Sequence, residues 1–305
     1  MKNRQSSFLR WAALGFVLLI MFTAFISFLV AVLAGSSSGG NIARIKITGV
    51  ITSEPETLLG GTTATSEQIA GLIRTADENP SIAGIILDIN SPGGSAVASE
   101  ELASAVKQAK KPVVALIRDV GTSGAYWAAS SADMVVASPL SITGSVGATA
   151  SYLEFSGLMG KYGVGYERIV SGEFKDAGSP FRNLTQEETL IMQEIIRQTG
   201  RYFAASVQEN RNLDAKTMKE VSTARIYTGQ QALELNLVDL LGNSETAKEA
   251  IKELAGVEEV NIVDYQVKTP FSLAGILSEQ ASAITNGILS SGIPSRKGMP
   301  ALVRD

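Results

Sequence analysis

The sequence predicts a mixed α/β fold built on a parallel sheet and attached to an N-terminal membrane helix. Short apolar runs at 82–90, 111–119 and 133–138 alternate with segments of helical spacing. Such alternation is typical of parallel sheets with right-handed crossovers, and runs that are apolar on both faces belong to central strands. An uncharged segment from Trp11 to Gly35 precedes them. The 305 residues are enough for one sizeable folded core or for two small ones.

The apolar segment predicts a transmembrane anchor over residues 11–34, because about 20 apolar residues span a bilayer. The alternative is a cleavable signal peptide, whose apolar core usually has only about 7–15 residues, although Val32 and Ala34 fit a small-residue cleavage pattern. The segment length favours retention. Basic residues lie within 1–10, so the positive-inside rule predicts a cytoplasmic N-terminus and an extracytoplasmic domain on a single-pass protein of the cell membrane.

The segments after the anchor predict the domain organisation. "GSSSGGN" at 35–41 is a flexible linker, and "ARIKITGVI" then alternates at the strand period, so we expect the extracytoplasmic domain to cover 42–271. Thr185 and Glu188 form a capping box that opens a long helix. The region 272–305 is expected to hold a C-terminal helix and a mobile tail. That helix has one apolar side, which suits another subunit, the membrane surface or its own domain.

The composition excludes several kinds of site. The chain has no histidine and no cysteine, so a Ser-His-Asp triad, a Cys-His pair and a zinc site built from histidine are impossible. The formal net charge is -4, and without the three basic residues before the anchor it is -7, from 23 basic and 30 acidic residues. An acidic domain predicts no nucleic-acid partner. We expect neither a metal ion nor another cofactor.

Ser123, within "GTSGAYWAAS", is a candidate nucleophile. It lies between a strand and a predicted helix, where the N–H of Gly124 could stabilise an oxyanion and the helix N-terminus favours negative charge. The pattern is not the Gly-x-Ser-x-Gly elbow, and without histidine the α/β-hydrolase interpretation fails. The proton acceptor must be a lysine, an aspartate or a glutamate.

Lys175, in "SGEFKDAGSPFR", follows the strand-like segment "GYERIV". A lysine acts as a base only if its surroundings lower its pKa from about 10.4, and a loop lysine beside an aspartate is most often a surface residue. The "SPGG" turn at 91–94 follows a buried strand at the edge where open α/β sheets bind ligands, but such a turn alone is usually only a turn. These residues by themselves leave the base unidentified.

Four motifs together resemble the signal peptide peptidase A family of serine-lysine proteases, in its short, single-domain form. They are "INSPGGS", "GTSGAYWAAS", "SPLSITGSVG" and "SGEFKDAGSPFR", in this order, with 52 positions from Ser123 to Lys175. The resemblance covers roughly residues 42–265 and the N-terminal anchor. It implies a Clp protease/crotonase-like spiral of ββα units.

The resemblance also implies a role for each site residue. Ser123 would be the nucleophile and Lys175 the general base. Ser145 would orient the lysine, and the N–H groups of Gly93 and Gly124 would form the oxyanion hole. The sequence departs from the family pattern at Ala125 and at 173–174, which affects the shape of the pocket and not the dyad.

Only one copy of the motif set is present, and short forms of this family assemble as rings whose neighbouring subunits complete each other's sites. The resemblance therefore implies a homo-oligomer, expected to be an octamer. The predicted function is a membrane-anchored serine endopeptidase that degrades remnant signal peptides and other short apolar peptides. The alternatives are a stomatin-directed membrane protease of the same fold and an inactive crotonase-like membrane scaffold. Coenzyme A chemistry is disfavoured because the anchor keeps the domain away from cytosolic thioesters.

Overall fold

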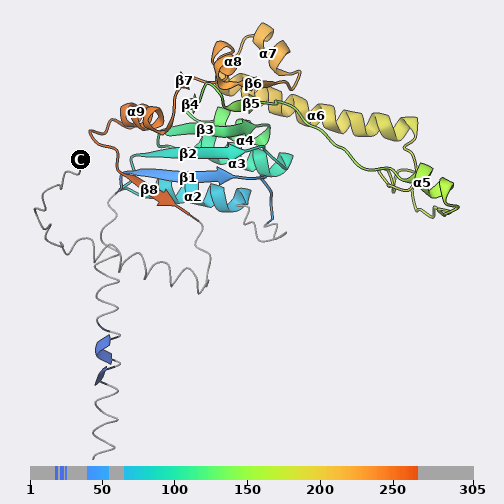
Figure 1. The fold of residues 1–305 in the computed structure, drawn as a ribbon, viewed down its shortest axis with the longest axis horizontal. Helices are drawn as coiled ribbons and strands as arrows, with labels where there is room; N and C mark the ends of the chain where they lie inside the picture. The colour runs from blue at the N-terminus through green and yellow to red at the C-terminus, as the bar shows by residue number, and fades with distance from the viewer. Residues whose placement is uncertain (1–17, 20, 24, 26–39, 55–64, 267–305) are drawn as a thin grey trace, which may run out of the picture. The chain divides into compact units, whose positions relative to one another are not determined.

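A mostly parallel sheet forms the centre of the protein in the computed structural model (Figure 1). The structure describes residues 40–54 and 65–266, together with 18–19, 21–23 and 25. Most of the expected anchor at 11–34 and linker at 35–41, and all of 1–10 and 272–305, lie outside the described residues. Among those that are described, no helix combines the length and the apolar character needed to cross a bilayer.

The sheet confirms the expected parallel strands. Its order is β6-β5-β3-β2-β1-β8, while β4 pairs with β3 and β7 pairs with β4. Every pair is parallel except β5 with β6. The strands are β1 (Ile42–Thr48), β2 (Gly84–Ser91), β3 (Val113–Thr122), β4 (Met134–Ala137), β5 (Ile142–Gly144), β6 (Ile226–Thr228), β7 (Leu240–Leu241) and β8 (Ile262–Tyr265).

Helices connect the strands, and a mixed α/β fold is therefore confirmed. The further expectation of a spiral of ββα units stays a prediction. The helices are α2 (Ser66–Glu78), α3 (Ala96–Gln108), α4 (Gly124–Ser130), α5 (Ser156–Lys161), α6 (Gln186–Arg211), α7 (Ala215–Val221), α8 (Gly229–Glu234) and α9 (Ser244–Ala255).

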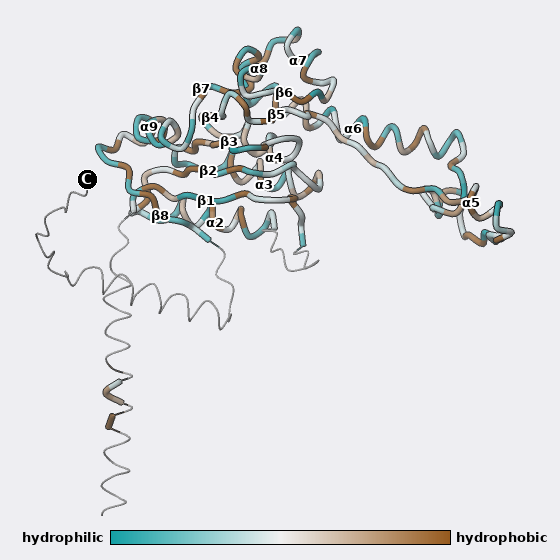
Figure 2. Tube along the Cα trace, viewed as in Figure 1, coloured by the Kyte–Doolittle hydropathy of each residue, from teal (hydrophilic) through white to brown (hydrophobic). Residues whose placement is uncertain are grey.

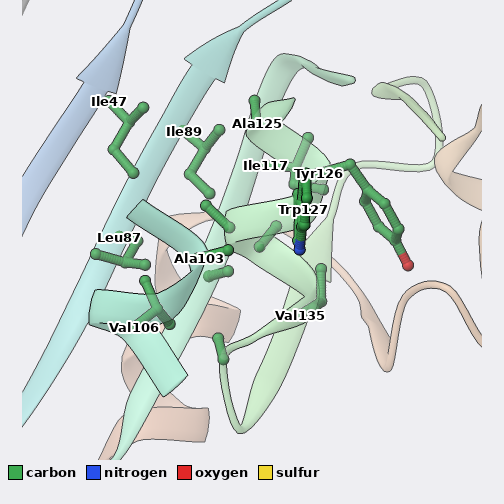
Figure 3. Close-up of a cluster of buried hydrophobic side chains, with 14 of the residues drawn as sticks. Ile47, Leu87, Ile89, Ala103, Val106, Ile117, Ala125, Tyr126, Trp127 and Val135 are labelled. Carbon is green, nitrogen blue, oxygen red and sulfur yellow. The ribbon is translucent and has the colours of Figure 1, made fainter. Parts of the chain in front are cut away.

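Apolar side chains cover both faces of the central strands, because successive residues of a strand point to opposite faces. On one face of β2, Leu87 and Ile89 pack in a large cluster with residues of α2, α3 and α4, part of which is shown in Figure 3. On the other face, Ile86 packs against Ala250 and Ile251 of α9. The sheet thus has helices on both faces, which explains the uninterrupted apolar runs of its central strands.

Helix α6 begins at the expected capping box, in which Thr185 and Glu188 bond each other's backbone N–H groups. Its C-terminal part packs on the core through Phe203 and Val207, whereas most of its N-terminal part is exposed. Figure 1 shows α5 beside the N-terminal end of α6, and Figure 2 shows hydrophobic residues around α5.

The strand-like segment at 165–170 does not form a strand. No neighbouring strand of the described chain pairs with this segment. Ile169 is 95% exposed there. A strand needs a pairing partner as well as the right pattern, and this pattern alone does not supply one.

Replacing Leu87 by alanine should destabilise the fold by about 2–5 kcal/mol, because the side chain is fully buried in a central strand and its loss leaves a cavity. Urea unfolding followed by tryptophan fluorescence measures the change. The matched control is Leu140→Ala, at a side chain that is 83% exposed, where the change should stay within about 0.5 kcal/mol. Equal effects of the two substitutions would contradict the described packing.

Candidate active site

Three neighbouring parallel strands, β2, β3 and β5, end at the same edge of the sheet. Ser91 pairs with Gly121 across β2 and β3, and Thr122 pairs with Gly144 across β3 and β5. The residues that follow these pairs are the Pro-Gly-Gly turn, Ser123 and Ser145. The register of the ladder therefore brings three of the motifs found in the sequence to one edge, where open α/β sheets bind ligands.

Ser123 has an unusual backbone conformation, with φ 53° and ψ -128°. A positive φ is rare for a residue with a side chain and is often found at functional sites. The Ser123 N–H donates to the carbonyl of Gly144 at 2.8 Å, and the Ser123 carbonyl accepts from Trp127 at 3.0 Å. The hydroxyl does not cap α4 and has no hydrogen-bond partner within the described part of the chain. It is therefore free to react.

The Pro-Gly-Gly turn is held tightly against this serine. Gly93 has φ 92°, and a Cβ there would lie 2.7 Å from the nitrogen of Gly124 and 2.9 Å from the Cβ of Ser123. Ile51 pins the turn from the other side, because its N–H donates to the Gly93 carbonyl and its carbonyl accepts from the Ser95 N–H. Only glycine fits at Gly93.

The N–H groups beside Ser123 differ in their availability. Gly124 is the first residue of α4, so its N–H has no acceptor within the helix. The N–H of Gly93 donates to the hydroxyl of Ser91 at 3.1 Å. The N–H of Gly94 has no acceptor among the described residues, and its nitrogen lies 3.6 Å from an ideal Cβ on Gly124. Gly94, which the sequence did not single out, is therefore a further candidate donor to an oxyanion.

A cavity of about 390 Å³ opens beside Ser123 and is lined by Ser145 as well. The size is in the range of ligand pockets. Trp127 contributes to its wall, and so do Ile196 and Phe203 of α6. Ile196 and Phe203 are seven residues apart and lie on one face of α6, so helical periodicity could have grouped them from the sequence. No local signal linked that face to Ser123.

The two aromatic residues after Ser123 have different roles. Tyr126 is fully buried and donates from its hydroxyl to the carbonyl of Leu237 at 2.8 Å, and burial raises the pKa of its hydroxyl well above the ordinary value. Trp127 stacks on Phe203 with ring centroids 4.5 Å apart and also lines the cavity. Figure 3 shows the two rings leaving α4 in different directions. Tyr126 supports the core, and Trp127 shapes the pocket.

Lys175 is exposed and is not among the residues that line the cavity. No charged side chain of the described residues lines that cavity. A single chain thus brings together Ser123, Ser145 and the glycine N–H groups, but it does not bring Lys175 to them.

Residues 105–258 match Peptidase family S49. "Putative protease MJ0651" of Methanocaldococcus jannaschii is 36% identical over 219 residues, which cover 71% of this chain and 70% of that protein. "Serine protease SPPA, chloroplastic" of Arabidopsis thaliana is 29% identical over 253 residues, which cover 81% of this chain and 36% of that protein.

Among solved structures, a membrane-bound stomatin-specific protease is 15% identical and matches with a TM-score of 0.47, covering 75% of this chain and 99% of that one. The family match spans half of the chain and includes Ser123 and Lys175. The chain belongs to peptidase family S49, the signal peptide peptidase A family.

Proposed function

We propose that the protein is a membrane-anchored serine endopeptidase in which Ser123 is the nucleophile and Lys175 the general base. The observation that carries the proposal is the Ser123 hydroxyl in a strained turn at a cavity of ligand-binding size, where neither this hydroxyl nor the N–H groups of Gly94 and Gly124 have a partner among the described residues. Membership of a peptidase family supports it.

The reaction proceeds through an acyl-enzyme. The Ser123 Oγ attacks the carbonyl carbon of the scissile peptide bond while its proton passes to the neutral Nζ of Lys175. Backbone N–H groups of Gly124 and of the Pro-Gly-Gly turn stabilise the negative oxygen. Lys175 then gives the proton to the departing amine. A water molecule, deprotonated by the same lysine, cleaves the ester and restores Ser123.

The lysine that serves each cavity comes from a neighbouring subunit. The absence of charged side chains from the lining of the cavity, as far as the chain is described, and the exposure of Lys175 support this arrangement. Exposed apolar side chains in the segment that precedes the lysine, at Leu153, Leu158 and Ile169, are suited to contact another copy of the chain. We propose a homo-oligomeric ring, expected to be an octamer.

The substrates are short apolar peptides, including remnants of signal peptides, at the extracytoplasmic face of the membrane. The described residues of the apolar segment are helical, and the apolar side chains among them, such as Leu18, Met21 and Phe22, are exposed, which supports a membrane anchor. The apolar wall formed by Trp127 and Phe203 suits an apolar side chain of the substrate.

Mixing two inactive variants tests both the dyad and the assembly. Ser123→Ala and Lys175→Ala should each abolish peptide hydrolysis, because the nucleophile and the base act as a unit. Co-assembled in equal amounts, they should recover about a quarter of the wild-type activity. In a randomly mixed ring, about a quarter of the sites take an intact serine from one subunit and an intact lysine from its neighbour.

The control mixes each variant with itself, at the same total concentration and after the same dissociation and reassembly. Activity that persists in either single variant would remove that residue from the dyad. The opposite result is that the two variants remain inactive together in rings that contain both. Serine and lysine of one chain would then act in the same site.

Replacing Ser145 by alanine should lower kcat by about tenfold or more, because the lysine loses the hydroxyl that orients it. In the wild-type enzyme the rate should rise with pH along one limb, since the neutral amine must form before attack. Single-turnover hydrolysis across the pH range measures both effects. An unchanged rate in Ser145→Ala would show that this hydroxyl has no part in orienting the base.

Peptides that differ only at the residue before the scissile bond test the pocket. Alanine or leucine there should be cleaved faster than aspartate or lysine, by about tenfold or more in kcat/KM, because a charge entering an uncharged cavity loses water without gaining a partner. Faster cleavage of the charged peptides would contradict the proposed apolar specificity.

A further inference from the structure

The turn that carries Lys175 is ordered by its own backbone. The Lys175 N–H donates to the carbonyl of Gly172 at 3.1 Å, and two further bonds follow, from Ala177 to Phe174 at 3.1 Å and from Ser179 to Asp176 at 2.9 Å. These consecutive turns fix the direction of the chain around the lysine. They do not by themselves fix the turn to the rest of the protein.

Asp176, the residue directly after the lysine, is clamped by two arginines. Arg168 donates to both carboxylate oxygens, with its Nη2 at 2.7 Å from Oδ1. Arg182 does the same, with Nε at 2.9 Å from Oδ2 and Nη2 at 2.7 Å from Oδ1. The bonds from Arg182, and then those from Arg168, hold the pKa of the Asp176 carboxyl far below its ordinary value. The carboxylate is only 14% exposed.

The clamp continues into helix α6. Arg182 also donates to both oxygens of Glu188, at 2.8 Å and 2.5 Å, and the Glu188 side chain is 2% exposed. Glu188 accepts in addition from the N–H of Thr185 at the start of the helix. The bonds from Arg182 and then from Thr185 lower the pKa of Glu188 to about 2. A buried carboxylate is tolerated only when it is paired in this way.

This arrangement solves a problem for a lysine base. A carboxylate next to an ammonium group favours the charged form of the lysine, which cannot accept a proton. In the described part of the chain, both oxygens of Asp176 are instead bonded to arginines, and Lys175 forms no ion pair. The neighbouring negative charge is thereby neutralised by groups other than the lysine.

We propose that Arg168 and Arg182 are positioning residues for the general base, which withhold Asp176 from Lys175 and fix the lysine turn to the start of α6. This inference rests on the proposed serine-lysine mechanism. The other charged groups on the turn and on the segments in contact with it include Glu154, Lys161, Glu167, Arg168, Glu173, Asp176, Arg182, Glu187 and Glu188. Removing one arginine therefore adds net negative charge beside the lysine, and removing Asp176 adds net positive charge.

Two variants should move the pH dependence of the rate in opposite directions. Arg168→Gln leaves Asp176 with one arginine, so the rising limb of kcat against pH should shift upward by about 0.5–1 pH unit, a three- to tenfold lower rate at a fixed pH on the limb. Asp176→Asn leaves Arg168 without its carboxylate partner and Arg182 paired only with Glu188, so one negative charge is lost near the lysine and the limb should shift downward, while the maximal rate falls because the turn has lost its anchor. A merely structural role would lower the maximal rate without moving the limb.

The matched control is Arg44→Gln, which removes another two-bonded arginine-aspartate pair, with Asp264 at the β1–β8 edge of the sheet. The rising limb of kcat against pH in Arg44→Gln should coincide with that of the wild type. Arg182→Gln is not used, because it leaves the buried Glu188 unpaired and threatens folding. Circular dichroism and sedimentation on the full-length protein verify that each tested variant is folded and assembled.

Opposite shifts in the two variants support the inference. If the rising limb of kcat against pH moves in neither variant, or moves in the same direction in both, the inference is wrong. Lys175→Ala, measured in parallel, distinguishes failure of this inference from failure of the serine-lysine mechanism. Substantial activity in Lys175→Ala would contradict the mechanism. If Lys175→Ala is inactive and the pH dependence of the other variants does not shift, only the proposed role of the arginines is wrong.

Discussion

The site depends on one hydrogen bond, from the N–H of Ser123 to the carbonyl of Gly144. This bond extends the parallel pairing of β3 and β5 by one residue beyond the last paired strand positions. It holds Ser123 in its positive-φ conformation, and it keeps Ser145, the residue after the acceptor, beside the same cavity. The Pro-Gly-Gly turn can then approach only because Gly93 has no side chain.

The sequence predicted the scaffold well, because its signals are local. Apolar runs of strand length gave the central strands, and the Thr185-Glu188 capping box marked the start of α6. The prediction that Ser123, Ser145 and the glycine turn meet followed from the resemblance to the family, and the sheet register explains it physically. The "GYERIV" segment looked like a strand and forms none, because a local sequence does not report whether a pairing partner exists.

Two features could not be predicted from local patterns. The face of α6 that carries Ile196 and Phe203 lines the cavity, and only the tertiary fold shows which surface a helix face meets. The arginine clamp joins residues on both sides of Lys175, and in the sequence Arg168, Asp176 and Arg182 look like ordinary surface charges. Their bonding depends on how the turn folds back on the helix, which composition and periodicity do not encode.

No charged side chain of the described residues lines the cavity, and this has a consequence for the proposed enzyme. On the proposed mechanism, an isolated chain carries a nucleophile without a base, so it is inactive until it assembles. Catalytic output then grows more steeply than chain concentration at low expression, because subunit association precedes the first turnover. On the same mechanism, such a threshold would spare other proteins from cleavage by isolated copies of the peptidase.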